Sequence, residues 1–398
     1  MKNAERTSWI RSHLHDSQID ALVCSLPCNV LMLTGYAPVI GTAVAVAFAD
    51  GRVSLIVPED EVDLVQHSWM VDAHAFAPGS LDKLEPASRA LVKPLKELIR
   101  LQVARIGFEN GEVSQPSLYS AVHFYSGSLS LLLAECFPHA TLAPADAILT
   151  ALRARKTPFE IERLRLAGRI AGEAFTKCAP SISVGTAEVA VAAAFRSSFA
   201  TGLLRNTGVP CCDGYAWCMS GANSALAGRA YARSGPKTIA RGDLVLMHAN
   251  SHADGYWTDI TRTYCAGEPH DRQRELFEAV FAAREAALQQ IRPGASASAV
   301  DQAARDALRQ RGLEAAFTHS TGHGVGFGAI SGNASPRLHP ASPDILETGM
   351  VFNVEPAVYF DGYGGIRHCD MVAVTASGYE LLTPFHCRIE DLILPMEA

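Results

Sequence analysis

Five side chains of the kinds that bind metals or transfer protons lie in four separated segments, GDLVLMHANSHADGYWTDITRTYC, TGHGVG, FNVEP and GIRHCD. They are His248, Asp259, His323, Glu355 and Cys369. Imidazole, carboxylate and thiolate groups bind zinc and iron, and the same groups act as acids, bases or nucleophiles. The segments therefore predict one polar site, provided that the fold brings them together.

The first segment reads as two strands and a turn. Apolar residues alternate in Leu244–Ala249, Ala253–Gly255 has turn residues, and Tyr256–Tyr264 is rich in aromatic residues and threonine. This pattern predicts that the return strand places Asp259 opposite His248. Both groups would then lie beneath a hydrophobic layer, where each is unfavourable unless it is paired or bound to something.

The other three segments place polar residues at points where the backbone ends a strand or turns. His323 lies among glycines, which let a ligand approach the ring closely, and Glu355 ends an apolar strand. Cys369 precedes a strand at Met371–Thr375. His368 should point to the opposite face, so we interpret it as a supporting residue rather than a ligand. A single such residue is usually structural, but four ordered segments indicate a site.

The chain has 398 residues, which favours two domains, and we place their boundary between residues 152 and 153, at a basic segment that ends in Thr157-Pro158. Residues 1–152 alternate between helical and strand patterns, with a hairpin at Asp50-Gly51. We predict a mixed α/β fold (α+β) for the chain. No phosphate-binding glycine loop follows any predicted strand.

Four helices are predicted in residues 153–398 from apolar residues at helical spacing. Their predicted ranges are Phe159–Cys178, Thr186–Thr201, Arg272–Ile291 and Ser298–Arg311. Each pair of helices is followed by predicted strands, an order that indicates two related halves.

Composition argues against several classes of partner. The charges, 34 basic and 41 acidic for a net charge of −7, give no electrostatic footprint for nucleic acid or an anionic membrane. The N-terminus does not read as a signal peptide and no apolar run is long enough to cross a bilayer, so we expect a cytoplasmic protein. The ten cysteines are scattered without CxxC spacing, and we expect most to be reduced and buried.

The order of the motifs GDLVL, DGYxxDITRT, TGHGxG, FNVEP and GIRxxD resembles the pita-bread family of metallopeptidases, peptidase family M24. This family includes methionine aminopeptidases, Xaa-Pro aminopeptidases, prolidases and creatinase. The resemblance covers the whole chain, since the first domain is similar to the N-terminal domain of the creatinase and prolidase branches. It implies a C-terminal pita-bread catalytic domain, and a homodimer.

The resemblance also implies a metal site. Peptidases of the family hold two divalent metals with five side chains, and the matching positions here are His248, Asp259, His323, Glu355 and Cys369. Two of them depart from the family, because an aspartate has become His248 and a glutamate has become Cys369. These softer donors disfavour a manganese or cobalt pair held by oxygens. We therefore expect one zinc or iron ion, with the alternative that no metal binds.

The residues that would contact substrate also depart from the family pattern. Prolidases carry histidines at positions that match the neighbourhood of Gly228 and Ile330, and both are missing here. Tyr231 and His339 are candidates to replace them in binding substrate. Arg367 is a third candidate, and we expect it to orient Glu355 or Asp259 through charge-assisted hydrogen bonds.

The resemblance favours a hydrolase similar to Xaa-Pro aminopeptidases and prolidases, which would cleave an amide or C–N bond of a small substrate or dipeptide. His248, Glu355 and Cys369 are its candidate catalytic residues, with Cys369 as a possible nucleophile. One alternative is a metal-free hydrolase of the creatinase type, although Thr261 stands where creatinase has a glutamate. The other alternative is a binding protein that has kept the fold without the chemistry.

Overall fold

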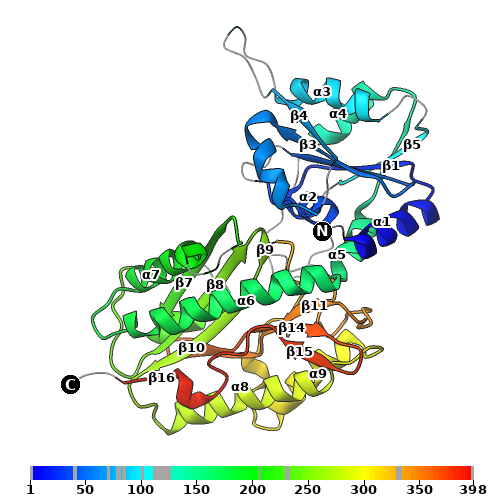
Figure 1. Cartoon of the computed structure of the whole chain (residues 1–398). Coiled ribbons are helices and arrows are strands. Elements are labelled where there is room, and N and C mark those ends of the chain that lie inside the picture. Colours follow the sequence, from blue (N-terminus) through cyan, green and yellow to red (C-terminus); the bar gives the residue numbers. More distant parts are fainter. Residues whose placement is uncertain are drawn as a thin grey trace. The chain divides into compact units, whose positions relative to one another are not determined.

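The computed structural model describes residues 3–38, 43–69, 72–77, 82, 87–99, 103–110, 127–204, 206, 208–228, 234–328 and 334–395 (Figure 1). Among these residues the chain forms two compact units, divided between Arg153 and Ala154. Both units combine helices and sheets, which confirms the predicted fold class. None of the helices in this part of the chain is both long enough and apolar enough to span a bilayer.

The first unit contains a six-stranded mixed sheet in the order β4-β3-β2-β1-β5-β6. Its strands are β1 (Ala21–Cys24), β2 (Val44–Phe48), β3 (Val53–Pro58), β4 (Asp72–Phe76), β5 (Arg105–Phe108) and β6 (Thr141–Pro144). Its helices are α1 (Ala4–Asp16), α2 (Pro27–Thr34), η1 (Glu59–His67), α3 (Ala87–Leu98), α4 (Ser128–Cys136) and α5 (Asp146–Ala154). The predicted Asp50-Gly51 hairpin joins β2 to β3, and Gly51 has a φ of 91°.

The second unit begins with the long helix α6 (Pro158–Cys178), whose start follows directly from the sequence. The Thr157 hydroxyl accepts a hydrogen bond from the Glu160 backbone N–H, and the Glu160 carboxylate accepts one from the Thr157 backbone N–H. This capping box satisfies two backbone donors that the first helical turn leaves without partners. Pro158 suits the first helical position because it has no backbone N–H that would need an acceptor.

The rest of this unit consists of helices and three sheets. The helices are η2 (Ala179–Ser181), α7 (Glu188–Ala200), η3 (Thr201–Leu204), η4 (Gly221–Gly228), α8 (Asp271–Gln289), α9 (Ala297–Arg309), η5 (Glu314–Ala316) and η6 (Ile389–Leu392). The strands of the first sheet are β7 (Cys212–Ser220), β8 (Leu244–Ala253), β9 (Tyr256–Trp257), β10 (Ile260–Ala266) and β16 (Ile393–Leu394). The others pair β11 (Val351–Val354) with β14 (Asp370–Val374) and β15 (Tyr379–Leu381), and β12 (Ala357–Phe360) with β13 (Gly364–Arg367).

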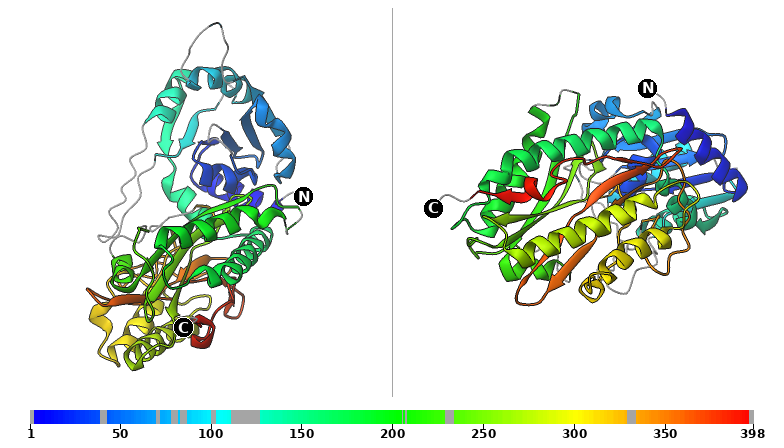
Figure 2. Two further views of the ribbon diagram at one scale, coloured as in Figure 1. Left: turned by 90° about the vertical axis from the view of Figure 1, so that its left-hand side faces the viewer. Right: turned by 90° about the horizontal axis from the view of Figure 1, so that it is seen from below.

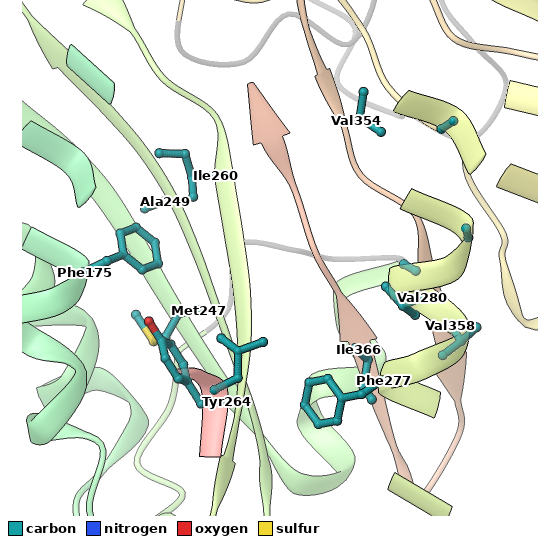
Figure 3. Packing of buried hydrophobic residues seen from close by; sticks show 14 of the residues in the cluster. Phe175, Met247, Ala249, Ile260, Tyr264, Phe277, Val280, Val354, Val358 and Ile366 are labelled. Atoms are coloured by element: carbon teal, nitrogen blue, oxygen red, sulfur yellow. The ribbon is translucent and has the colours of Figure 1, made fainter. Parts of the chain in front are cut away.

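One large hydrophobic core runs through this unit. Phe175 of α6 lies toward Met247 of β8 and Tyr264 of β10, whereas Phe277 of α8 lies toward Ile366 of β13 (Figure 3). All five side chains are fully or almost fully buried. Helices α8 and α9 pack side by side (Figures 1 and 2). The core therefore fixes the strands that carry the polar segments.

The predicted register of β8 and β10 is wrong by two residues. Thr261 lies opposite His248, and Asp259 precedes β10. The cause is the tight turn at Asp254 and Gly255, whose φ angles are 54° and 77°. A two-residue connection fixes the pairing of the whole hairpin, and this one aligns position 248 with position 261.

The first sheet meets the strands near the C-terminus at the polar segments. Thr261 and Cys369 form an isolated antiparallel bridge, in which the Cys369 N–H donates to the Thr261 carbonyl at 3.0 Å. A second bridge joins Gly324 to Phe352 of β11. These links bring segments far apart in the sequence to one place.

Candidate functional site

The five residues predicted as metal donors lie at this junction, and each is no more than 5% exposed. His248 lies on β8, Asp259 directly before β10, His323 in the loop before β11, Glu355 directly after β11, and Cys369 between β13 and β14. Four segments of the chain thus converge on one buried polar cluster, which we call the donor cluster.

Asp259, Glu355 and Cys369 form the centre of the donor cluster, because each offers a ligand atom and these atoms all lie within 4.8 Å of one another. His323 stands beside them, with Nε2 at 3.7 Å from Asp259 Oδ2 and 3.9 Å from Glu355 Oε1. Two carboxylates this close repel each other when both are charged. A cation among them would relieve that repulsion.

The tautomer of His323 suits metal binding through Nε2. Its Nδ1 lies 3.1 Å from the Gly324 carbonyl oxygen, which can only accept, so Nδ1 carries the proton and Nε2 keeps its lone pair. Such a hydrogen bond from the other ring nitrogen is the usual support of a metal-binding histidine. The backbone is fixed as well, since the His323 N–H donates to Asn353 Oδ1 at 2.7 Å.

The glycine before His323 is required by close packing. A Cβ atom at Gly322 would lie 1.9 Å from the Asn353 carbonyl oxygen, far inside contact distance. Thr321 is anchored on the other side, where its N–H and hydroxyl both donate to Asp301 Oδ1 at 2.9 and 2.8 Å. The motif TGHG therefore holds the His323 ring by contacts on both sides.

His248 is held differently from His323. Its Nδ1 lies 2.9 Å from Thr261 Oγ1 and 3.9 Å from Asp259 Oδ1, and its ring stacks on Trp217 with centroids 5.4 Å apart at 16°. Burial lowers the pKa of His248 to about 4, so the ring is neutral at physiological pH.

Cys369 is a fully buried thiol. Its Sγ lies 3.2 Å from the Asp259 carbonyl oxygen, to which the S–H donates. Burial, and then the charges of Asp259 and Glu355, raise the pKa of Cys369 well above its usual value. A nucleophilic cysteine needs a lowered pKa, so these surroundings do not favour Cys369 as a nucleophile.

Glu355 is poised to exchange a proton. Burial raises its pKa to about 7, the Arg367 guanidinium opposes this, and the Asp259 carboxylate adds to it. Arg367 Nε lies 3.9 Å from Glu355 Oε2, close enough for attraction but too far for a hydrogen bond. The Nε–H instead donates to Thr261 Oγ1 at 3.0 Å. A carboxyl group with a pKa near 7 suits general acid or base catalysis.

His339, one of the other two predicted substrate residues, is held in a local turn rather than by a residue of the donor cluster. His339 is partly exposed, and its Nδ1 accepts a hydrogen bond from the Ala341 N–H at 3.0 Å, which closes a local turn. Tyr231 and Ile330 lie outside the described residues. Gly228 packs against the Tyr359 ring, and a Cβ there would lie 2.8 Å from a ring carbon.

Sequence reasoning missed two residues that adjoin Arg367. Tyr359 accepts a hydrogen bond from Arg367 Nη1 at 3.4 Å, and its hydroxyl lies 2.9 Å from His319 Nε2. Burial, followed by the charge of Arg367, lowers the pKa of His319 to about 3. The sequence shows only that His319 lies four residues before His323 and Tyr359 four residues after Glu355, and this spacing does not reveal their contacts with each other.

All ten cysteines lie within the described residues and all are free. Seven of them are buried, in agreement with the expectation of reduced, buried thiols. Only Cys369 belongs to the donor cluster, so the others do not bear on its chemistry.

The two units and the donor cluster define a two-domain α/β protein with a buried group of potential metal ligands, and comparison with known proteins gives its family. Residues 162–376 match the model of metallopeptidase family M24, and residues 6–155 match that of the creatinase/prolidase N-terminal domain. The chain belongs to metallopeptidase family M24.

Similar proteins include peptidases of bacteria and archaea. An uncharacterized peptidase of Bacillus subtilis, YqhT, is 32% identical over 292 residues, 73% of this chain and 76% of its own. The Xaa-Pro dipeptidase of Pyrococcus furiosus is 28% identical over 95% of this chain and 97% of its own. The solved Xaa-Pro dipeptidase of Bacillus anthracis has a TM-score of 0.78 at 26% identity, covering 98% of this chain and 99% of that one.

Proposed function

We propose that this protein hydrolyses an amide or C–N bond of a small substrate, such as a dipeptide, with one divalent metal in the donor cluster. The observation that carries the proposal is the convergence of Asp259, Glu355 and Cys369 within 4.8 Å, with the unprotonated Nε2 of His323 beside them. The similarity to Xaa-Pro dipeptidases supports peptide-like substrates.

The residues present fit one metal ion better than the pair that the family resemblance implies. Asp259, His323 and Glu355 would hold it, and Cys369 would join them once its proton is released. Only two carboxylates remain to bridge metals, and one nitrogen and one sulfur favour zinc or iron over manganese or cobalt. When bound, such an ion polarises a substrate carbonyl and makes its water more acidic.

The protein groups around the cluster supply the rest of the chemistry. Glu355 takes a proton from the attacking water and returns it to the leaving nitrogen. Arg367 keeps a positive charge 3.9 Å from this carboxylate and favours its ionised form. The near-complete burial of the donors excludes bulk water, which strengthens every electrostatic interaction in the site.

The test is elemental analysis combined with a hydrolysis screen. Wild-type protein purified without chelator should hold about one equivalent of zinc or iron per chain and hydrolyse a member of a panel of Xaa-Pro dipeptides, other dipeptides and small amides. His323→Ala should lose both the metal and the activity. Wild-type protein that takes up no metal after incubation with zinc, iron, manganese and cobalt would refute the single-metal proposal.

A metal-free hydrolase of the creatinase type is the second candidate. It is favoured by one observation, which is that two of the five matching positions carry protonated or neutral groups, the Cys369 thiol and the His248 ring. Hydrolysis that persists in the presence of a strong chelator would establish this candidate. Tight binding without turnover would instead indicate a binding protein.

A further inference from the structure

A chain of hydrogen bonds runs beside the donor cluster, and we call it the relay. Its members are His319, Tyr359, Arg367, Thr261 and His248. The direction of its first bond is fixed, because His319 Nδ1 lies 2.8 Å from the Ser320 carbonyl oxygen. A carbonyl only accepts, so the proton of this neutral ring is on Nδ1 and its Nε2 must accept.

Tyr359 is the second member of the relay, and both its hydroxyl and its ring are held in place by neighbouring residues. Its hydroxyl donates to His319 Nε2 at 2.9 Å, so its oxygen accepts from Arg367 Nη1. The ring is fixed by two glycines, since Cβ atoms at Gly228 and Gly365 would lie 2.8 and 2.5 Å from ring carbons. Tyr359 therefore helps to hold the Arg367 guanidinium in place.

Arg367 is the donor in both of its hydrogen bonds within the relay, because a guanidinium only donates. Its Nε–H donates to Thr261 Oγ1 at 3.0 Å, which leaves the hydroxyl proton of Thr261 available for a second bond. His248 Nδ1 lies 2.9 Å from that oxygen. Asp259 Oδ1 does not compete with Thr261 for Nδ1, because at 3.9 Å it is beyond hydrogen-bond distance.

We propose that the relay fixes His248 as the tautomer with its proton on Nε2. The lone pair of Nδ1 is then engaged by Thr261 and Nε2 has none to offer, so His248 is not a metal ligand. Stacking on Trp217 keeps the ring plane fixed. The consequence for metal binding rests on the proposed function, whereas the tautomer does not.

The tautomer is tested on the whole chain with histidines labelled with nitrogen-15, in the presence of chelator and at pH 8. The signals of His248 are assigned by their loss in His248→Gln. We expect a proton on Nε2 and none on Nδ1. A proton on Nδ1 in the wild type would overturn the proposal.

Two threonines of β10 offer a matched pair of variants. Thr261→Val removes the hydroxyl that contacts His248, and should release the ring to a mixture of tautomers. Thr263→Val is the control, because Thr263 is equally buried but bonds to the Arg367 backbone at 3.0 Å. An unchanged tautomer in a folded Thr261→Val protein would also overturn the proposal, and the wild-type spectrum decides if that variant fails to fold.

Metal analysis completes the test. His248→Gln should keep the wild-type metal content, whereas His323→Ala should fall to less than about a tenth of it. Loss of metal in His248→Gln would show that His248 is a ligand and overturn the proposal. A wild type without metal would refute the proposed function instead, while the nitrogen-15 spectrum would still decide the relay.

Discussion

Two clusters of charged residues lie on opposite sides of the same strand junction, and they are compensated in different ways. On the donor-cluster side, Asp259 and Glu355 face His323 at 3.7 and 3.9 Å. On the other side, Asp370 receives hydrogen bonds from Arg262 and Arg284, both at 2.6 Å. The nearest cation of the first cluster is Arg367, whose Nε stays 3.9 Å from Glu355 Oε2, whereas both arginines of the second cluster are within hydrogen-bond distance of Asp370.

This difference separates a binding site from a structural one. His368, Asp370 and Cys387 also place potential ligand atoms within 4.8 Å of one another. However, burial acts to raise the pKa of Asp370, and Arg262, His368 and Arg284 together hold it well below its usual range. Two arginines already occupy this carboxylate, so a metal ion gains little there. Geometry alone would suggest two metal sites, and the charges indicate one.

The largest effect is expected from Asp370→Asn, which leaves the buried Arg262 without its anion and Arg284 with Glu285 alone. Removing one partner of a buried ion pair typically costs about 3–5 kcal/mol, a large share of the stability of most proteins. We expect a strongly lowered midpoint of urea unfolding, or failure to fold. Glu314→Gln, which breaks the exposed pair with Arg309, is the control and should leave the midpoint almost unchanged. Equal stability of the two variants would contradict the structural role.

Asp259→Asn should have the opposite effect, with little change in stability and a large loss of hydrolysis. The buried Asp259 carboxylate faces His248 and His323 at 3.9 and 3.7 Å rather than an arginine at hydrogen-bond distance, so the substitution should change the stability of the metal-free protein by no more than about 1 kcal/mol. Hydrolysis should fall by about 10²-fold or more, the scale for losing one electrostatic group in a catalytic site. The comparison uses urea unfolding in chelator, which removes stabilisation by bound metal, and initial rates without chelator. A loss of stability as large as that of Asp370→Asn would remove the distinction between the clusters.

The sequence indicated which residues lie together at the donor cluster, because the motifs keep their order and all of the polar residues except His248 lie at a strand end or between strands. It did not predict the pairing of Thr261 with His248, which depends on where the tight turn at Asp254 falls. Nor did it indicate His319 and Tyr359. Their roles arise from contacts across the fold that no spacing within one segment records.

Much of the fold was also predictable from local signals. The capping residues of α6 and the Asp-Gly turn between β2 and β3 act over a few residues, and both elements form as expected. By contrast, Arg284 looks like an ordinary polar residue of a helix, and only tertiary packing makes it a partner of Asp370. The sequence therefore could not predict that Asp370 would be paired with arginines while Asp259 and Glu355 would not.

Restoring the family's carboxylates would sharpen the comparison on the donor-cluster side. The double variant His248→Asp/Cys369→Glu adds two oxygen donors to a cluster that already has Asp259 and Glu355. We expect the metal content to rise from about one to about two equivalents per chain, with manganese or cobalt now accepted. Each single variant is the control and should stay near one equivalent. Two equivalents in the wild type would show that the present donors already hold a pair.

The smallest effect is expected from changing one histidine on the structural side. His368 Nε2 lies 3.3 Å from Asp370 Oδ2, and its ring lies 4.9 Å from that of Phe281. Because both arginines remain on Asp370 and a phenylalanine ring keeps the packing, His368→Phe should cost only about 1 kcal/mol and leave the metal content unchanged. The same replacement at His323 removes a lone pair that faces two carboxylates, so it should abolish metal binding while sparing the metal-free fold. Urea unfolding in chelator and elemental analysis of both variants measure this contrast. If His368→Phe also lost the metal, the two sides of the junction would be one site, and the division argued from their charges would be wrong.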